Sequence, residues 1–135
     1  TAPLNNVRQV LEYGVSVIPR EKILMGIPNY AYDWALPFVQ GESMAEAITN
    51  QEAIARAARY GVTIEFDEAA QAPFYYYTDE QGVQHVVWFD DARSMNAKLG
   101  LIPEFQIRGA GVWQIMNFFP ALWMVVNELF NIEIG

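Results

Sequence analysis

The sequence contains no cysteine and a single histidine, His85. The lack of cysteine excludes disulfide bonds, thiolate catalysis and cysteine-ligated zinc. One histidine cannot build a histidine metal site by itself, so we expect neither a metal site nor a cofactor. No apolar run approaches the roughly 18 residues that a membrane span needs. We therefore expect no membrane insertion.

Basic residues are also scarce, with 8 Lys and Arg against 16 Asp and Glu, and the formal net charge is -8. No basic run is present, so the chain lacks the electrostatic footprint of a protein that binds nucleic acid. A neutral polymer such as a polysaccharide is compatible with this charge.

Two features indicate a segment of something larger. Charged residues make up only 18% of the chain, whereas about 25% is usual in a globular domain. The first residues, TAPLNN, include neither an initiator methionine nor the basic and apolar regions of a signal peptide. We therefore expect an excised or processed segment that is either unusually buried or has part of its surface facing another unit.

The two ends of the chain each combine a helix with a buried strand. Apolar spacing predicts a helix over Leu4–Val17, ended by Pro19, and then a continuous apolar strand over Lys22–Ile27. Near the other end, GAGVWQI predicts a second buried strand over Gly109–Ile115, and Pro120 begins a last helix. Buried runs next to amphipathic helices indicate a parallel sheet.

The middle of the chain predicts a small α+β unit. Ser43 and Glu46 have the spacing of a capping box and predict a short helix. The other expected elements are a helix over Gln51–Tyr60 capped by Asn50 and ended by Gly61, a strand over Val62–Asp67, a hairpin of PFYYYT and VQHVVWF around DEQG, and a helix over Asp91–Leu99. The strand and the hairpin together predict an antiparallel sheet.

Two aromatic clusters lie where the buried strands end, and they are our candidate site residues: Tyr30, Tyr32, Asp33 and Trp34 after the first strand, and Trp113 with Gln114 in the second. Function in parallel α/β folds sits at the carboxyl ends of strands. Flat aromatic faces with polar rims suit sugar rings. The alternative interpretation is an aromatic cap over the sheet, or a core tryptophan.

Three further clusters are better explained by structure. Adjacent Asp67 and Glu68 usually point in different directions, so they indicate a solvated strand end and not a catalytic pair. Asp90 and Asp91 fit capping and charge at a helix N-terminus. The tyrosines of Phe74–Thr78 favour packing within the sheet, with the lining of a saccharide groove as the alternative.

The motifs KILMGIPNYAYDW, FDEAAQAPFYYYTDEQGVQHVVWFDDARSMNAKLGL and RGAGVWQIM resemble the C-terminal third of family 18 glycoside hydrolases. The likeness is greatest to the spore-cortex branch of bacterial N-acetylglucosaminidases, which act on peptidoglycan and often carry LysM domains. GIPxYxYDW and VWFxDARS, in this order, carry the resemblance, and it covers essentially the whole chain.

The resemblance implies a (β/α)8 barrel, of which this chain would supply strands seven and eight with their helices. Residues 1–34 would be one barrel segment, 35–90 an α+β insertion that walls the substrate groove, and 91–135 a second barrel segment. Trp113 would floor the subsite of the sugar to be cleaved, and Tyr30 would follow strand seven. Ala31 and Gln114 depart from the glycine and glutamate common at these positions.

The resemblance also implies what the chain lacks. The acid signature of the family, Asp-x-x-Asp-x-Asp-x-Glu, is absent from the sequence, and so is the Tyr-Asp pair of strand six. In the family, that Glu is the acid and the acetamido group of the substrate is the nucleophile, in a retaining, substrate-assisted reaction. We therefore expect no catalytic residue in this chain and no hydrolysis by the chain alone, and we interpret Asp33 as a wall or positioning residue.

The leading hypothesis is therefore that the chain is part of a glycosidase that acts on N-acetylglucosamine-containing glycans. We expect this enzyme to be extracytoplasmic, at the cell wall or spore surface. The alternatives are a non-catalytic saccharide-binding or interaction module, and a structural domain whose aromatic residues are all core. Barrel strands without their neighbours expose apolar edges, so we also expect a homodimer.

Overall fold

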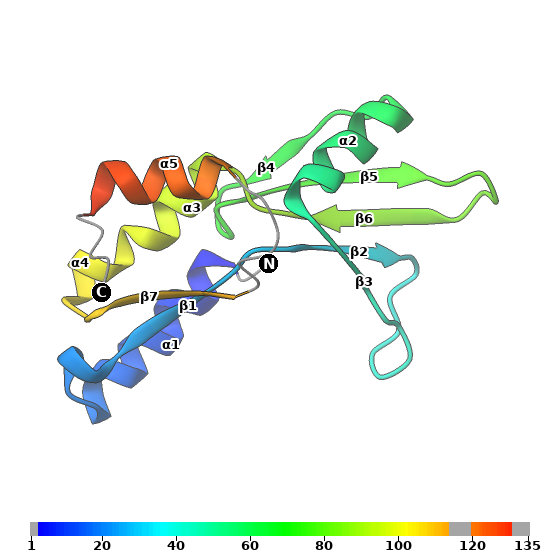
Figure 1. Ribbon diagram of the computed structural model, residues 1–135. Helices are drawn as coiled ribbons and strands as arrows, with labels where there is room; N and C mark the ends of the chain where they lie inside the picture. The colour runs from blue at the N-terminus through cyan, green and yellow to red at the C-terminus, as the bar shows by residue number, and fades with distance from the viewer. Residues whose placement is uncertain (1–2, 114–119, 131–135) are drawn as a thin grey trace.

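The computed structural model describes residues 3–113 and 120–130. Along the chain the elements are α1 (Leu4–Val17), η1 (Arg20–Lys22), β1 (Leu24–Pro28), β2 (Ala31–Ala35), β3 (Glu46–Ile48), α2 (Asn50–Tyr60), β4 (Glu65–Asp67), β5 (Ala72–Thr78), β6 (Gln84–Trp88), α3 (Ala92–Leu99), α4 (Leu101–Phe105), β7 (Gly109–Trp113) and α5 (Pro120–Leu129). Figure 1 shows two parts: α1, α3, α4 and α5 gather around β1 and β7, and α2 accompanies the remaining strands.

The two buried strands pair in parallel, as the sequence predicts. β1 and β7 run in register from Leu24 opposite Gly109 to Pro28 opposite Trp113. Met25 and Ile27 point from β1 into a core that also takes side chains from α1, α3, α4 and α5. The carboxyl ends of the two strands therefore lie side by side.

The middle of the chain forms the antiparallel sheet that the sequence predicts, with five strands in the order β3-β2-β6-β5-β4. The hairpin of β5 and β6 turns at Asp79, whose Oδ1 accepts the backbone N–H groups of Gln81 and Val83, each at 2.9 Å. Gly82 has φ 80° there, a conformation that favours glycine. α2 packs its Ala53 and Ala57 against one face of this sheet.

The prediction of a short helix at Ser43 and Glu46 is wrong. Glu46–Ile48 is strand β3, which pairs with β2, and the Ser43 hydroxyl accepts the backbone N–H of Val39 at 2.7 Å. Pairing with a neighbouring strand outweighs the local capping pattern here, because strand formation depends on tertiary context.

Helix α2 begins one residue earlier than predicted and is capped by Thr49, whose hydroxyl accepts the backbone N–H of Glu52 at 3.0 Å. Asn50 is buried, and its Oδ1 accepts the backbone N–H of Asp90 at 2.9 Å. Gly61, with φ 64°, ends the helix as predicted.

Other boundaries also differ from the prediction. The expected strand over Val62–Asp67 is limited to Glu65–Asp67, and helix α4 was not predicted. Gly100 follows α3, with φ -63°, and leads directly into α4. The last helix begins at Pro120 as predicted, whereas Gln114 and Ile115 lie outside the described residues.

Candidate functional site

The segment after β1 contains a further strand, which the local sequence pattern did not predict. Residues 31–35 form β2, which pairs with β3 and β6 in the antiparallel sheet. Because side chains alternate along a strand, Tyr32 and Trp34 point to one face and Asp33 to the other. The candidate cluster is therefore divided between the two faces of the sheet.

Tyr30 lies between β1 and β2 and lines a pocket of about 320 Å3. The remaining lining residues come from β3 and the start of α2: Glu46, Ala47, Ile48, Thr49, Glu52 and Arg56. The rings of Tyr30 and Tyr32 meet edge to face, with centroids 5.2 Å apart. This pocket combines an aromatic face with charged and hydroxyl groups, a combination that suits a polyhydroxylated ligand.

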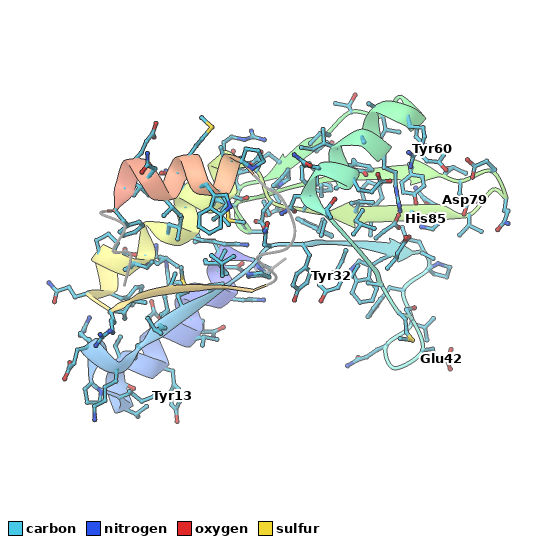
Figure 2. All side chains as sticks on the ribbon, viewed as in Figure 1. Tyr13, Tyr32, Glu42, Tyr60, Asp79 and His85 are labelled. Carbon is cyan, nitrogen blue, oxygen red and sulfur yellow. The ribbon has the colours of Figure 1, made fainter. Side chains whose placement is uncertain are left out.

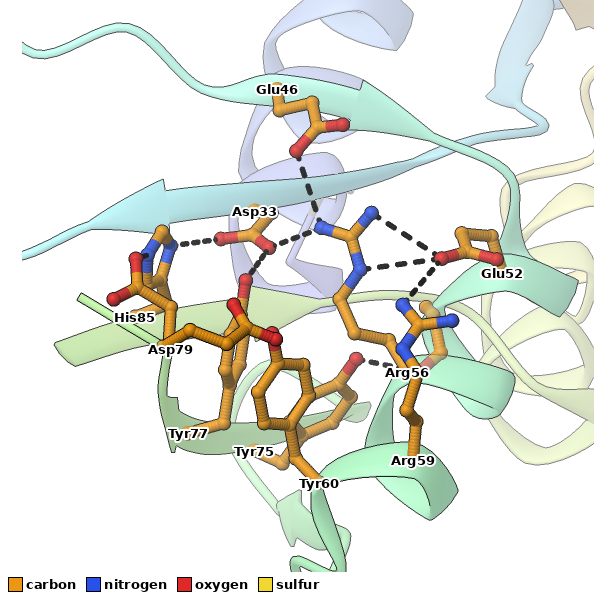
Figure 3. A network of polar contacts seen from close by, with 12 residues as sticks. Asp33, Glu46, Glu52, Arg56, Arg59, Tyr60, Tyr75, Tyr77, Asp79 and His85 are labelled. Atoms are coloured by element: carbon orange, nitrogen blue, oxygen red, sulfur yellow. Dashed lines mark hydrogen bonds and ion pairs between the residues drawn. The ribbon is translucent and has the colours of Figure 1, made fainter. Parts of the chain in front are cut away.

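Asp33 lies at the centre of a polar network between the sheet and α2 (Figure 3). Its Oδ2 lies 2.6 Å from Nη1 of Arg56 and also accepts the hydroxyl of Tyr77. Its Oδ1 lies 2.7 Å from Nδ1 of His85, whose Nε2 lies 2.8 Å from Oδ2 of Asp79. Both oxygens of Asp33 are therefore engaged by protein groups.

The Asp33 side chain is only 2% exposed. A carboxylate that is buried and already shared among three side chains has no free face for a sugar. Through these contacts Asp33 holds β2 to α2, β5 and β6. Its role as a wall or positioning residue stays a prediction.

The network shifts the pKa values of its members. Burial alone would lower the pKa of His85, but hydrogen bonds to Asp79 and Asp33 outweigh burial and raise it. The pKa of Asp79 is lowered by its hydrogen bond to His85 and by the backbone N–H groups of Val83 and Gln81. These shifts favour a positively charged imidazole between two carboxylates.

The cation and the phenols of the network keep their protons. Burial opposes the charge of Arg56, yet hydrogen bonds with Glu46, Asp33 and Tyr77 raise its pKa. Burial raises the pKa of Tyr75 to about 12, and its hydroxyl donates to the carbonyl oxygen of Ala53 at 2.5 Å. These groups act as hydrogen-bond donors and not as general bases near neutral pH.

Asp90 and Asp91 have separate structural roles. Asp91 caps α3 by accepting the backbone N–H of Ser94 at 3.0 Å, so the capping prediction is confirmed. Asp90 is buried, and its Oδ1 accepts from Lys98 Nζ and from the Ser94 hydroxyl, both at 2.9 Å. This buried ion pair was missed because a lysine in a helix normally indicates a solvated position.

Trp113 ends β7, where its backbone pairs with Pro28 of β1. Gln114, the other candidate of this strand, lies outside the described residues. Within residues 3–113 and 120–130, no group of three His, Asp or Glu side chains could hold a metal ion. Over the same residues, no helix is long and apolar enough to cross a membrane.

Comparison with known proteins places these features in a family. The model of glycosyl hydrolases family 18 matches residues 1–117. The cortical fragment-lytic enzyme of Bacillus subtilis (strain 168) is 42% identical over 131 residues. The crystal structure of the spore cortex-lytic enzyme SleL of Bacillus megaterium QM B1551 is 50% identical, with a TM-score of 0.92.

This chain covers only part of those relatives. The alignments with the B. subtilis enzyme and with SleL span 97% of this chain and 30% of each relative. A chitinase from Chromobacterium violaceum ATCC 12472 shares the fold with a TM-score of 0.84 at 27% identity, over 93% of this chain and 38% of that protein. The resemblance read from the sequence motifs is thereby confirmed. The chain belongs to glycosyl hydrolases family 18.

Proposed function

We propose that this chain is the C-terminal part of a glycosidase barrel and supplies the floor and one wall of a groove for N-acetylglucosamine-containing glycans. The observation that carries the proposal is the parallel pair of β1 and β7, in which Pro28 lies opposite Trp113. This register supports the assignment of β1 and β7 to strands seven and eight of a barrel. It brings Trp113 and the segment leading to Tyr30 to the same end of the two strands.

The chain then divides into barrel segments over 1–34 and 91–135, with an insertion over 35–90 whose sheet also uses β2. Trp113 would offer its ring as the floor, with Gln114 after it, and Tyr30 would stand at the wall. The pocket beside Tyr30 adds Glu46 and Thr49 as polar groups. Asp33 would contribute to the groove indirectly, because its contacts hold β2 in position.

The catalytic acid would come from a barrel strand outside this sequence, in the retaining, substrate-assisted reaction that the family resemblance implies. None of the polar groups described here substitutes for it, because Asp33 is buried in ion pairs and Tyr75 and Tyr77 hold their protons. The chain alone is therefore an inactive partial site. In the whole protein we place its action outside the cytoplasm, on the cell wall or the spore surface.

The experiment is a calorimetric titration of the chain with N-acetylglucosamine oligomers, together with a hydrolysis assay on the same sugars. We expect binding without turnover, and weaker binding in Tyr30→Ala and Trp113→Ala. Tyr13→Ala and Trp123→Ala are matched controls, because Tyr13 is 71% exposed on α1 and Trp123 is 37% exposed on α5. Turnover by the chain alone, or equal affinity in all four variants, would contradict the proposal.

A further inference from the structure

His85 joins the turn of the β5–β6 hairpin to strand β2. Its Nδ1 lies 2.7 Å from Oδ1 of Asp33 on β2, and its Nε2 lies 2.8 Å from Oδ2 of Asp79, which follows β5. Figure 2 shows Asp79 and His85 toward the end of the sheet that is remote from β1 and β7. One imidazole therefore lies between two carboxylates that come from different parts of the sheet.

Each of these two contacts requires a proton on the imidazole. An ionised carboxylate can only accept hydrogen bonds, and a neutral imidazole has one N–H group and one bare nitrogen. Only the imidazolium form can therefore donate to Asp33 and Asp79 at the same time. In the neutral form, one ring nitrogen would direct its lone pair at a carboxylate oxygen 2.7 or 2.8 Å away. That repulsive contact has to open.

The surroundings of the two carboxylates decide which contact opens. The Asp33 side chain is 2% exposed, and its other oxygen accepts from Arg56 and Tyr77. The Asp79 side chain is 20% exposed, so water can replace the imidazole there. Loss of a partner costs more at a buried oxygen than at one that water can reach. The neutral ring therefore keeps its proton on Nδ1, toward Asp33, and releases Asp79.

The phenols and the carboxylate that pack near His85 do not titrate near neutral pH. Tyr77 of β5 stacks on the imidazole, with centroids 4.7 Å apart and 11° between the planes, and burial raises its pKa. Tyr60 of α2 packs on the Tyr77 ring at 4.5 Å, and its hydrogen bond to Glu80 raises its pKa. A backbone N–H group and this hydrogen bond lower the pKa of Glu80. These groups keep their protonation while a histidine titrates.

Two charges close to the imidazole are also fixed. Arg56 of α2 contacts Asp33 at 2.6 Å and Glu46 of β3 at 3.2 Å. Burial opposes its charge, but its hydrogen bonds raise its pKa, so it stays a cation. The pKa of Asp79 is lowered by its contact with His85 and by backbone N–H groups. The imidazole of His85 therefore titrates against the constant charges of Arg56 and Asp79.

Asp79 holds the hairpin turn as well as the imidazole. Its Oδ1 accepts the backbone N–H groups of Gln81 and Val83, each at 2.9 Å. Its own backbone N–H donates to the carbonyl oxygen of Val83 at 2.9 Å. Both oxygens belong to one rigid carboxylate. When Oδ2 loses the imidazole, the group is free to rotate, and the hold of Oδ1 on the turn weakens.

We propose that His85 is a pH-operated clamp on the β5–β6 hairpin: the doubly protonated ring fixes Asp79 and the turn, and the neutral ring releases them while it stays bonded to Asp33 through Nδ1. The clamp is closed below about pH 6.5, the ordinary value for a histidine, and opens as the pH rises above it. It is built from residues of this chain alone, so it does not depend on the proposed function.

The test follows the hairpin by nuclear magnetic resonance of the 135-residue chain, from about pH 5.5 to 8.5. Long-range nitrogen–proton spectra of His85 identify the ring nitrogen that keeps its proton. Amide hydrogen exchange, corrected for the intrinsic effect of pH, measures the protection of Gln81 and Val83. Ala70 is the internal control, because its backbone N–H donates to Oδ1 of Asp67 at 2.7 Å, a similar contact without a histidine.

We expect the amide signals of Gln81 and Val83 to shift with the same midpoint as the imidazole of His85. Their protection should fall by about tenfold above that midpoint, the order of one hydrogen bond to a charged group. The neutral ring should carry its proton on Nδ1. The amide of Ala70 should keep its protection.

Two variants separate the clamp from a general loss of stability. His85→Gln keeps a hydrogen-bonding side chain that does not titrate, so Gln81 and Val83 should lose their pH dependence. Asp79→Asn keeps an oxygen for the two backbone N–H groups and offers an amide donor to the neutral ring. The turn should then stay protected at high pH, and the midpoint of His85 should fall. Glu42→Ala, at an exposed carboxylate, should retain the wild-type profile.

Four outcomes would overturn the clamp. A proton on Nε2 at high pH would show that the contact to the turn survives and the contact to β2 opens. Turn amides without the midpoint of His85 would show that the turn is independent of the imidazole. A wild-type pH profile in His85→Gln would assign the effect to another group. Protection of Ala70 that falls in step with the turn amides would indicate general loosening of the chain.

Discussion

Asp33 on β2 and Arg56 on α2 form an ion pair of 2.6 Å, although their side chains are only 2% and 13% exposed. They are 23 residues apart in the chain. Arg56 also contacts Glu46 of β3 at 3.2 Å and Glu52 of α2 at 3.3 Å. One guanidinium therefore joins two strands to the helix that covers them.

Replacing Asp33 should destabilise the insertion. In Asp33→Ala, Arg56 loses its buried partner, and Tyr77 and His85 each lose an acceptor. Removal of one member of a buried ion pair costs about 3 kcal/mol, so the free energy of unfolding should fall by about that amount. Urea denaturation followed by circular dichroism measures it. Glu42→Ala is the control, since Glu42 is exposed, and a loss equal to that of the control would contradict the proposed role of Asp33.

His85 should make stability depend on pH. Its pKa is raised by Asp79 and Asp33 in spite of burial, so the folded state holds the imidazolium proton more tightly than the unfolded chain, whose His pKa is about 6.5. This contribution to stability is complete below that pH and is lost as pH rises through the higher folded-state pKa. The free energy of unfolding should therefore decrease above about pH 6.5 in wild type.

The check uses the fact that His85 is the only histidine in the sequence. Its imidazole proton resonances can be followed without ambiguity, and we expect a titration midpoint above about 6.5. In His85→Gln the decrease in stability above about pH 6.5 should disappear. A midpoint at or below the free-histidine value would show that burial outweighs the two carboxylates.

The local patterns sufficed to predict α1, the buried pair β1 and β7, the β5–β6 hairpin and the beginning of α5. Each of these elements has an apolar period or a turn residue that acts over a few neighbours. Strand β2 was missed because its alternation places a carboxylate, Asp33, on the buried face. Only contact with Arg56 makes that burial acceptable, and no local pattern indicates a partner 23 residues away.

The candidate site, like the fold, could be predicted from the sequence only in part. The aromatic residues past β1 were found from their position after a strand, and the division between the two faces followed only from the pairing of β2 with β6. The register of the sheet was needed to see that Trp88 and Phe74, from strands far along the chain, lie on the same face as Tyr32. Helix α4 was not predicted; its Pro103 lies in the first helical turn, where proline is tolerated.

Replacing one member of the buried pair Asp90 and Lys98 should strongly destabilise the fold. Their side chains are 0% and 1% exposed, so Lys98→Ala leaves a buried carboxylate without its cation, at a cost of about 3 to 5 kcal/mol. The double variant Asp90→Asn with Lys98→Met should be less destabilised than Lys98→Ala, because it leaves no buried charge. Thermal unfolding measures both, and Lys22→Ala, at an exposed lysine, is the control. A double variant no more stable than Lys98→Ala would contradict this account.

The edge formed by α1 and β1 should mediate self-association. A groove of about 440 Å3 there is lined mainly by apolar side chains, among them Val10 and Leu24, which are 69% and 61% exposed. An exposed apolar edge recruits another chain, so we expect a dimer by light scattering, and Leu24→Lys should convert it to a monomer. Met44→Lys is the matched control, because Met44 is 89% exposed but lies in the loop before β3. A wild-type chain of monomer mass, or equal dissociation by both variants, would exclude this edge as the interface.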